Sequence, residues 1–293
     1  MTRAVGPVTV IGDLLEDIVV WVRGPVSPGT DNSATIRRSR GGSAANVAAA
    51  VAARGVPARF VGRVGADEAG AALVAQLAAR GVDVRIQRAG RTGCVVVLVD
   101  EHGERTMFPD RAAAAELGPI DADDLDGSAL VHVPLYGLAD PAAAAPILAA
   151  VGVARRAGTR LSLDLSATSI VDRLGSHEVR SMLVDLRPDL VFATAAEAGC
   201  AGLTGGAQPP GVTLVIKDGA GPAVVVATDG ARVLVPPGPV EAVRDTTGAG
   251  DAFAGAFLAA WVAGAAPGEA AAAGHALAAA VLGVAGADPH PSP

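Results

Sequence analysis

The segment Asp245-Thr-Thr-Gly-Ala-Gly-Asp251 stands directly before a long apolar, alanine-rich run. A turn of small residues that opens onto a helix aims several backbone N–H groups at one point, and the helix dipole adds partial positive charge there. Such a point suits a phosphate or a developing oxyanion. Asp251 falls beside it, where a carboxylate can take a proton from a hydroxyl. The segment therefore predicts an anion site with a base next to it.

Composition favours one large α/β domain with a sizeable core. The chain has 293 residues, of which 51% are hydrophobic and 18% charged. Its net charge is −7 and it contains no basic tract, so we expect no nucleic-acid partner. Cys94 and Cys200 lie far apart, which argues against a disulfide framework or a zinc site. The start of the chain does not resemble a signal peptide, and the apolar run 252–266 is shorter than a membrane span. We therefore expect a soluble, cytoplasmic protein without membrane contact.

Three common nucleotide-binding patterns are excluded. The only lysine, Lys217, is followed by Asp218, so no Walker A loop is present. A eukaryotic-type protein kinase needs an H-R-D loop, which the chain lacks. No G-x-G-x-x-G follows the first predicted strand, where the chain reads Gly12-Asp-Leu-Leu15, and this argues against a dinucleotide-dependent oxidoreductase.

Strands alternate with helices along most of the chain, which predicts a parallel sheet covered by helices on both faces. Four short β-like segments (18–22, 34–36, 84–87 and 94–100) break this alternation. We interpret them as a small accessory sheet over the carboxyl edge of the main sheet, a position typical of a lid. We thus predict a single α/β domain over residues 1–288, lid strands within about 17–39 and 83–108, and a flexible tail at 289–293. Ser43 is expected to cap the helix that follows it.

Two motifs carry a resemblance to a known family. The segment Asp245-Thr-Thr-Gly-Ala-Gly-Asp251 resembles the second signature of the ribokinase-like, or PfkB, sugar kinases. Gly41-Gly-Ser-Ala-Ala-Asn46, followed by Gly62-Arg-Val-Gly-Ala-Asp67, resembles the first signature region. Both motifs occur in family order at family spacing, and the resemblance spans essentially the whole chain. It implies a ribokinase-like three-layer α/β/α sandwich with a mostly parallel central sheet and a small β-sheet lid.

At the second signature, the resemblance implies the roles that the residues themselves predict. Asp251 matches the base that deprotonates the acceptor hydroxyl. The backbone N–H groups of Thr247, Gly248, Ala249 and Gly250 match the anion hole for the transferring phosphoryl group. An ordinary helix start with an Asp in its first turn is the alternative for this segment taken alone.

Gly41, Gly42 and Asn46 match the sugar-binding turn of the family. A pair of glycines lets backbone approach a substrate closely, and an Asn one turn into the helix can bond a hydroxyl. A plain junction between loop and helix is the alternative. Ser43 stands where ribokinases proper usually have lysine, which weakens an assignment to ribose.

Acidic residues after the first strand match those with which relatives grip sugar hydroxyls. Asp17 is the better match, whereas Asp13 fits a solvated turn residue equally well. Arg105, together with Asp110 and Arg111, falls in the region that lines the acceptor pocket in relatives. A charged pair there favours a phosphorylated or carboxylated sugar, and surface ion pairing is the alternative.

Two further segments match the nucleotide side of the family site. Thr194-Ala-Ala-Glu197 aligns with an Asn-x-x-Glu that organises magnesium and the phosphates, with Thr194 in place of the Asn. Glu197 is expected to act on Mg²⁺ through water. Lys217-Asp-Gly219-Ala-Gly221 resembles the nucleotide loop, in which Lys217 reaches a phosphate. An exposed loop lysine is the alternative.

Two weaker matches complete the site. His275 falls near a position that contacts adenine in relatives, and a satisfied helix histidine is the alternative. Asp245 and residues 285–287 fall where some relatives coordinate a potassium ion.

The resemblance thus implies ATP-dependent phosphoryl transfer to a hydroxymethyl group of a sugar, with Mg²⁺ and, as in some relatives, K⁺ as cofactors. A nucleoside kinase on the same fold and a non-catalytic metabolite-binding relative are the alternatives. Ribose, fructose, a ketodeoxy sugar acid and a nucleoside all remain open as acceptors. An accessory sheet with an apolar face often pairs with its twin, so we expect a homodimer through the lid.

Overall fold

The computed structural model describes residues 5–205, 207–240, 243 and 245–283. A nine-stranded sheet forms its centre. In spatial order its strands are β13 (Arg232–Val235), β12 (Ala223–Val226), β11 (Thr213–Lys217), β10 (Leu190–Thr194), β9 (Arg160–Asp164), β8 (Leu130–Pro134), β1 (Val8–Ile11), β4 (Ala58–Val64) and β5 (Val82–Arg88). The strands from β11 to β5 pair in parallel, and β12 and β13 add an antiparallel edge. The carboxyl ends of the parallel strands therefore meet at one edge of the sheet.

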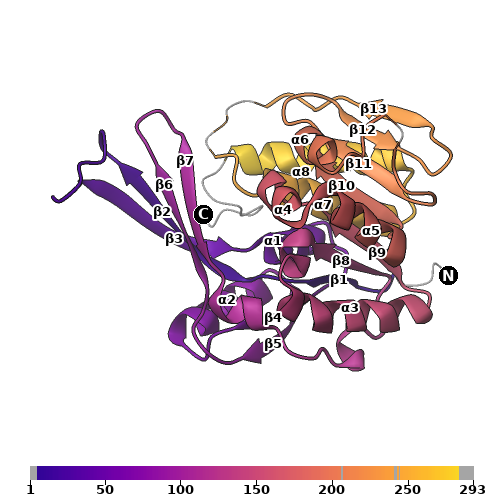
Figure 1. The fold of residues 1–293 in the computed structure, drawn as a ribbon, viewed down its shortest axis with the longest axis horizontal. Helices are drawn as coiled ribbons and strands as arrows, with labels where there is room; N and C mark the ends of the chain where they lie inside the picture. Colours follow the sequence, from indigo (N-terminus) through magenta and orange to yellow (C-terminus); the bar gives the residue numbers. More distant parts are fainter. Residues whose placement is uncertain (1–4, 206, 241–242, 244, 284–293) are drawn as a thin grey trace.

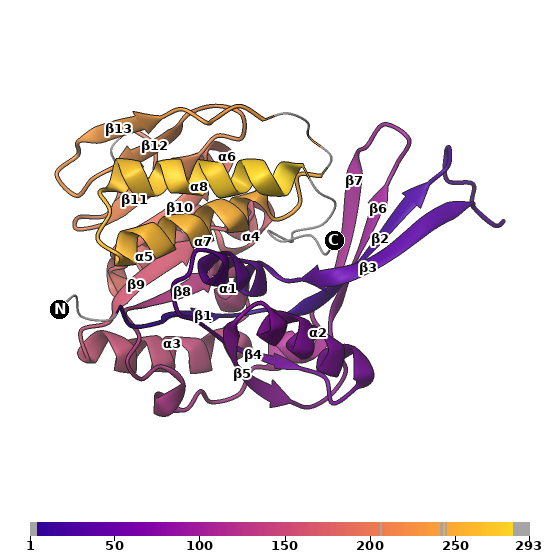
Figure 2. The same ribbon diagram turned by 180° about the vertical axis from the view of Figure 1, so that it is seen from behind.

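Helices cover both faces of this sheet (Figures 1 and 2). One face carries α1 (Ser43–Ala53), α2 (Glu68–Ala79), α7 (Ala249–Val262) and α8 (Pro267–Leu282). The other carries α3 (Pro141–Arg156), α4 (Thr168–Leu174), α5 (Ser176–Leu186) and α6 (Ala195–Cys200). Short 3₁₀ turns η1 (Ala112–Glu116), η2 (Ala122–Asp124) and η3 (Leu135–Leu138) lie in the connections. The two hydrophobic cores lie between the sheet and each helix layer, which confirms the three-layer sandwich predicted from the sequence.

A second, four-stranded sheet stands off the body as the lid (Figure 1). Its order is β3 (Ala34–Gly41), β2 (Leu15–Val22), β6 (Cys94–Val99) and β7 (Arg105–Asp110). Strand β2 begins just after β1 ends, and β3 runs directly into α1. The lid is thereby joined to the carboxyl edge of the main sheet, as expected.

One lid prediction was wrong. Residues 84–87 were assigned to the accessory sheet, but β5 pairs in parallel with β4 at the edge of the main sheet. An edge strand is only half covered, so β5 alternates apolar Val82, Val84 and Ile86 with polar residues, as a lid strand does. The tail at 289–293 lies outside the described residues. Among the residues that are described, no helix is long and apolar enough to cross a bilayer.

Helices α1 and α7 pack with very close backbones at Gly255. A Cβ atom at Gly255 would lie 2.5 Å from Ala50 Cβ and 2.8 Å from the Val47 carbonyl oxygen. No larger residue fits there without moving one helix. The contact brings the starts of the two helices together at the carboxyl edge of the sheet.

Gly255→Ala is expected to lower the free energy of unfolding by about 1–3 kcal/mol, because the added methyl group overpacks the contact between α1 and α7. Gly152→Ala in α3 is the matched control, since its Cβ would meet only the Arg156 side chain at 3.5 Å. Alanine there should leave stability unchanged or raise it by about 0.5–1 kcal/mol through helix propensity. Urea denaturation measures both. Equal stability of the two variants would contradict the close packing.

Candidate active site

Asp251 lies in the first turn of α7, next to the turn that starts this helix. Gly248 is the N-cap residue and adopts a left-handed conformation with φ of 73°, which glycine adopts without strain. The Asp251 carboxylate accepts a hydrogen bond from the Ser43 hydroxyl at 2.7 Å and another from the Asn46 amide nitrogen at 2.9 Å. Both donors come from α1. The structure thus places a carboxylate, two neutral donors and a helix N-terminus at one point.

The surroundings of Asp251 raise the pKa of its carboxyl group. Burial raises the pKa of Asp251 to about 6, and the negative charge of Asp164 acts in the same direction. The hydrogen bonds from Ser43 and Asn46 and the charge of Lys217 oppose this shift in pKa. A carboxylate with a pKa near 6 is ionised at neutral pH and is a stronger base than an ordinary aspartate.

Ser43 has a different role from the one that its position predicted. The N-cap residue of α1 is Gly42, with φ of 95°, and no side chain caps this helix. The Ser43 hydroxyl instead bonds Asp251 across a separation of 208 residues in the chain. Sequence reasoning missed this role, because a serine at a helix start normally signals a cap.

Arg40 was also missed, and it fixes the orientation of Asn46. The buried Arg40 guanidinium donates to the Asn46 side-chain oxygen at 2.9 Å. Because a guanidinium can only donate, the amide oxygen of Asn46 must face Arg40 and the amide nitrogen must face Asp251. The predicted sugar-binding Asn is therefore held in one orientation beside the base.

The glycine pair before α1 is required by close contacts with the Asp17 side chain and the Asp13 backbone. A Cβ atom at Gly41 would lie 2.1 Å from the Asp17 carboxylate, and one at Gly42 would lie 2.3 Å from the Asp13 carbonyl oxygen. Only glycine at both positions leaves room for these contacts. The structure brings Gly41, Gly42, Asp13 and Asp17 together, as the resemblance implied.

Asp13 and Asp17 differ in their partners. Asp13 accepts two hydrogen bonds of 2.7 Å from the Arg111 guanidinium and is buried, so it is not a solvated turn residue. Asp17 lies on β2 with a pKa raised to about 6, first by burial and then by the charge of Asp251, while Arg40 acts in the opposite direction. The charge of Asp251 thus contributes to the raised pKa of Asp17.

Arg105 reaches from the lid to the turn before α7. It lies on β7, and its guanidinium donates to the Thr247 hydroxyl at 2.8 Å and to the Asp245 carboxylate. The same carboxylate oxygen accepts the Thr247 backbone N–H at 2.8 Å, so this N–H does not join the anion hole as the resemblance implied, and the candidate donors are those of 248–250. The lid strand β7 is thereby hydrogen-bonded to the segment that holds the predicted anion hole. Arg105 already forms an ion pair with the Asp245 carboxylate.

The predicted magnesium motif forms the start of α6. Thr194 is the N-cap residue, and its hydroxyl accepts the Glu197 N–H at 3.2 Å while Glu197 accepts the Thr194 N–H at 2.8 Å. Thr194 thus caps this helix in a reciprocal capping box, a role that an Asn could also fill, so the cap does not explain why Thr replaces Asn. Burial, followed by the charge of Asp164, raises the pKa of Glu197.

The predicted nucleotide loop follows β11. Gly219 has φ of 52°, and a Cβ atom at Gly221 would lie 2.6 Å from the Asp218 carboxylate, so the loop itself requires both glycines. Lys217 is not an exposed loop residue. Its side chain is buried and donates to Asp164 at 2.7 Å.

His275 lies on α8, and its side chain contacts the β12–β13 hairpin. Its Nε2 atom is 3.0 Å from the Val235 carbonyl oxygen and 3.3 Å from the Ala223 backbone nitrogen, and its ring contacts Phe253 edge-on. These contacts fit the satisfied helix histidine that we considered as the alternative. They do not place it among the carboxylates of the site.

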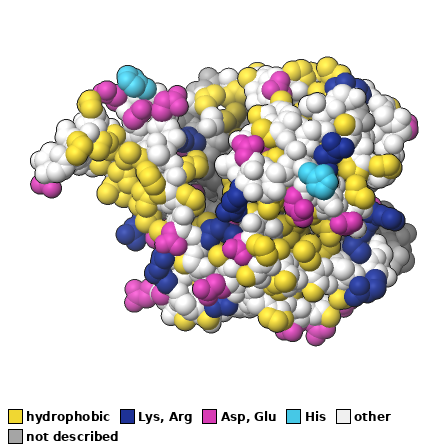
Figure 3. Space-filling view, in the orientation of Figure 1, with side chains coloured by type: hydrophobic (Ala, Val, Ile, Leu, Met, Phe, Trp, Pro, Cys, Tyr) yellow, Lys and Arg dark blue, Asp and Glu magenta, His cyan; other side chains and the backbone are white. Residues whose placement is uncertain are grey.

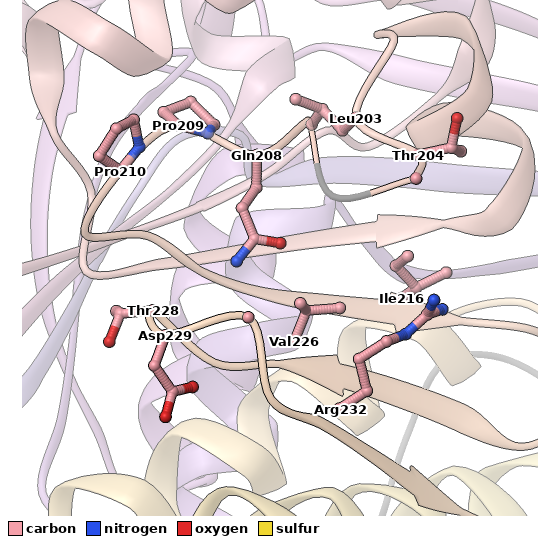
Figure 4. Close-up of a pocket in the computed structure, with 12 residues that line it drawn as sticks. Leu203, Thr204, Gln208, Pro209, Pro210, Ile216, Val226, Thr228, Asp229 and Arg232 are labelled. Atoms are coloured by element: carbon pink, nitrogen blue, oxygen red, sulfur yellow. The ribbon is translucent and has the colours of Figure 1, made fainter.

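A separate pocket lies between the loop after α6 and the β12–β13 turn (Figure 4). Gln208, Asp229 and Arg232 supply polar groups to its lining. Ile216, which also lines it, packs against the core between the sheet and α3–α6, whereas Lys217 lies over Phe192 of the core on the other face of the sheet. None of the predicted site residues lines this pocket, so the candidate active site is the carboxylate cluster around Asp251.

Known proteins are similar to this chain in sequence and in fold. The pfkB family of carbohydrate kinases matches residues 7–293. The chain is 34% identical over 254 residues to an ATP-dependent ribose-1-phosphate kinase of Halopiger xanaduensis, covering 80% of this chain and 78% of that protein. It is 32% identical over 277 residues to a fructokinase of Klebsiella pneumoniae, covering 87% and 84%.

A solved structure agrees with these matches. The adenosine kinase of Sinorhizobium meliloti superposes with a TM-score of 0.85 at 27% identity, covering 98% of this chain and 96% of that chain. The chain therefore belongs to the PfkB family of carbohydrate kinases and is a sugar kinase, a phosphotransferase whose acceptor is an alcohol group.

Proposed function

We propose that the protein transfers the γ-phosphoryl group of ATP to a hydroxymethyl group of a sugar, with Asp251 as the base. The observation that carries this proposal is the position of Asp251. Its carboxylate lies in the first turn of α7, beside the Gly248 turn, and accepts hydrogen bonds from the neutral donors Ser43 and Asn46. A carboxylate without a bound cation keeps the basicity needed to take the acceptor proton.

The anion hole follows from the same helix start. The first N–H groups of a helix lack intrahelical partners, so those of Gly248 and Gly250 can reach equatorial oxygens of the transferring phosphoryl group. The Ala249 N–H makes only a long bond of 3.4 Å to the Thr246 carbonyl oxygen, which it would exchange for a phosphoryl oxygen. Water must be excluded from this point, and the lid tied down by Arg105 would do so. Positioning and electrostatics then supply most of the catalysis.

ATP and Mg²⁺ fit the residues present. A Cβ atom at Gly219 would have no other atom within 4 Å, so a nucleotide can approach the backbone after β11 at this glycine, and Glu197 would act on Mg²⁺ through water. Within the described part of the chain, no group of three or more His, Cys, Asp or Glu residues is placed to hold a metal. Mg²⁺ would thus be held mainly by phosphates and water, and it would neutralise charge on the transferring group.

Potassium fits less well. An ion at Asp245 would have to displace the Arg105 guanidinium, and residues 285–287 lie outside the described residues. We therefore propose a reaction with ATP and Mg²⁺ alone. Because the reaction uses ATP, we propose that the enzyme acts in the cytoplasm.

The acceptor is proposed to be uncharged. Asp17, Gly42 and Asn46 would hold its hydroxyl groups under the lid. The lid and pocket arginines that would favour a phosphate or carboxylate are matched already, Arg111 by Asp13 and Arg105 by Asp245. A fructose-type sugar is our first choice because of the fructokinase relative, and a nucleoside is second because of the adenosine kinase structure.

A panel of acceptors tests this choice. ADP release with MgATP should be fastest with fructose or another neutral sugar, compared with adenosine, ribose-1-phosphate and a ketodeoxy sugar acid. A kcat/KM at least tenfold higher for ribose-1-phosphate would contradict an uncharged acceptor. ATP turnover with none of these compounds, despite tight sugar binding, would indicate the non-catalytic alternative.

Replacing the base should abolish turnover without unfolding the protein. Asp251→Asn keeps the shape and can still bond Ser43, but it cannot accept a proton, so kcat should fall by about a thousandfold. Asp229→Asn, at an exposed hairpin turn, is the matched control. Coupled ADP-release kinetics and thermal melting measure both variants. Asp251→Asn with a tenth of wild-type kcat would refute the assigned role.

The pH profile should report the base. Asp251 acts only when ionised, so kcat/KM should rise with pH through about 6 and then level off. The Ser43 hydrogen bond lowers the pKa of Asp251, so Ser43→Ala should move this limb to higher pH. Thr228→Ala, in the exposed hairpin turn, should leave the limb in place. A limb that Ser43→Ala does not move, or moves down, would assign it to another group such as Asp17, whose pKa is also about 6.

We further propose a homodimer through the lid. The outer face of the small sheet presents six apolar side chains in register, and Figure 3 shows hydrophobic side chains gathered on the lid. They are Ile18, Val20, Ile36, Val96, Leu98 and Phe108. Ile36 and Phe108 are 60% and 55% exposed, which is unusual for a solvent-facing sheet.

Ile36→Glu with Phe108→Glu should convert the dimer to a monomer, because two buried charges would oppose each other in the interface. Leu234→Glu on β13 is the matched control, since Leu234 is similarly exposed, at 63%. Light scattering coupled to size exclusion measures the mass. A wild-type protein that is monomeric at micromolar concentration would contradict the proposed dimer.

A further inference from the structure

Lys217 and Asp164 form a buried ion pair that sequence reasoning did not foresee. Lys217 ends β11 and Asp164 ends β9. The Lys217 Nζ atom donates to Asp164 Oδ2 at 2.7 Å, and the two side chains are only 12% and 6% exposed. Lys217 is the only lysine in the sequence.

The ion pair between Lys217 and Asp164 spans the intervening strand β10. Because β10 lies between β9 and β11, the Lys217 side chain must extend over β10 to reach Asp164. Phe192 on β10 is in register with Asp164, and the Lys217 Nζ atom lies 5.8 Å from the centre of its ring. Phenylalanine thus forms an apolar floor with a favourable π face under the ammonium group. This path keeps Lys217 away from solvent and fixes where its charge lies.

The ammonium group lies directly beside the predicted anion hole. A Cβ atom at Gly250 would be 3.6 Å from Lys217 Nζ, a van der Waals contact, so no side chain separates the lysine from this turn. Gly250 immediately precedes Asp251, and Lys217 and Asp251 interact electrostatically. A full positive charge is thereby placed next to the N–H groups that would receive phosphoryl oxygens.

A buried ion pair contributes little to stability compared with apolar residues of the same size, because both charges lose their hydration. Such a pair at the carboxyl edge of a sheet, beside an anion-binding turn, is better explained by the placement of its cation than by stability. Asp164 also accepts the backbone N–H of Ser166 at 2.9 Å through its other oxygen, so the carboxylate is held from two sides.

We infer that Lys217 completes the anion hole by stabilising charge on the transferring phosphoryl group, and that Asp164 is the positioning residue that holds Lys217 there. This inference rests on the proposed kinase reaction. Other titratable groups that interact electrostatically with Asp251 or Lys217 come from several elements. They are Asp17 on β2, Tyr136 in η3, Asp164 on β9 and Glu197 in α6.

The first test is kinetic. Lys217→Met should lower kcat by about a hundredfold, the loss seen when one donor is removed from an oxyanion hole, while KM for the acceptor changes little. Lys217→Arg should recover part of this loss. Asp164→Asn should lower kcat by about tenfold or more, because Lys217 is no longer held in place. Asp164→Asn combined with Lys217→Met should be no slower than Lys217→Met alone, since Asp164 acts through the lysine.

The second test separates placement of charge from structural support. The acid limb of the pH profile should move to lower pH in Asp164→Asn and to higher pH in Lys217→Met, because the first removes a negative charge near Asp251 and the second a positive one. Titration calorimetry without acceptor should show that Lys217→Met weakens the binding of Mg²⁺ and the non-hydrolysable ATP analogue AMP-PNP about tenfold. The same variant should weaken the binding of ADP by less. Asp189→Asn breaks the Arg155–Asp189 ion pair far from the site and is the matched control.

The possible outcomes distinguish a failure of the proposed kinase reaction from a failure of the inference about Lys217 and Asp164. Wild-type protein without phosphoryl transfer to any acceptor would contradict the proposed function. Active wild-type enzyme, with Lys217→Met and Asp164→Asn both within twofold of its kcat, an unmoved acid limb and unchanged AMP-PNP binding, would overturn the inference alone. A loss of melting temperature with these kinetic values intact would show that the pair only supports the fold.

Discussion

Close packing of α1 against α7 at Gly255 determines where the base lies. Both helices begin at the carboxyl edge of the sheet, and their contact brings Ser43 and Asn46 of one helix to Asp251 of the other. These residues are more than 200 positions apart in the chain. The geometry of the base therefore depends on a tertiary contact between backbones, and only a glycine permits it.

Charge matching divides the carboxylates of the site into two groups. Asp13, Asp164 and Asp245 each form an ion pair with an arginine or lysine side chain. Asp251 accepts hydrogen bonds from neutral donors and is raised in pKa by burial and by the neighbouring charge of Asp164. Electrostatics alone thus distinguish the proposed base from the residues that hold the lid, the acceptor pocket and Lys217 in place.

Local motifs were readable from the sequence, whereas contacts across the sheet were not. The anion turn and Asp251 are contiguous, so the pattern alone predicted their association. Asp164 has no motif, and its link to Lys217 depends on the order β9-β10-β11 and on Phe192 between them. Ser43 was misread as a cap because its partner lies in α7. The edge strand β5 was wrongly assigned to the lid because a half-buried strand of either sheet alternates apolar and polar residues.

The most direct test of Asp251 as the base is a crystal structure of the enzyme with ADP, Mg²⁺, aluminium fluoride and the preferred acceptor. We expect the acceptor hydroxyl within about 3 Å of the Asp251 carboxylate and the aluminium fluoride against the N–H groups of 248–250. An acceptor bound away from Asp251, or amides of this turn that face away from the aluminium fluoride, would contradict the proposed mechanism.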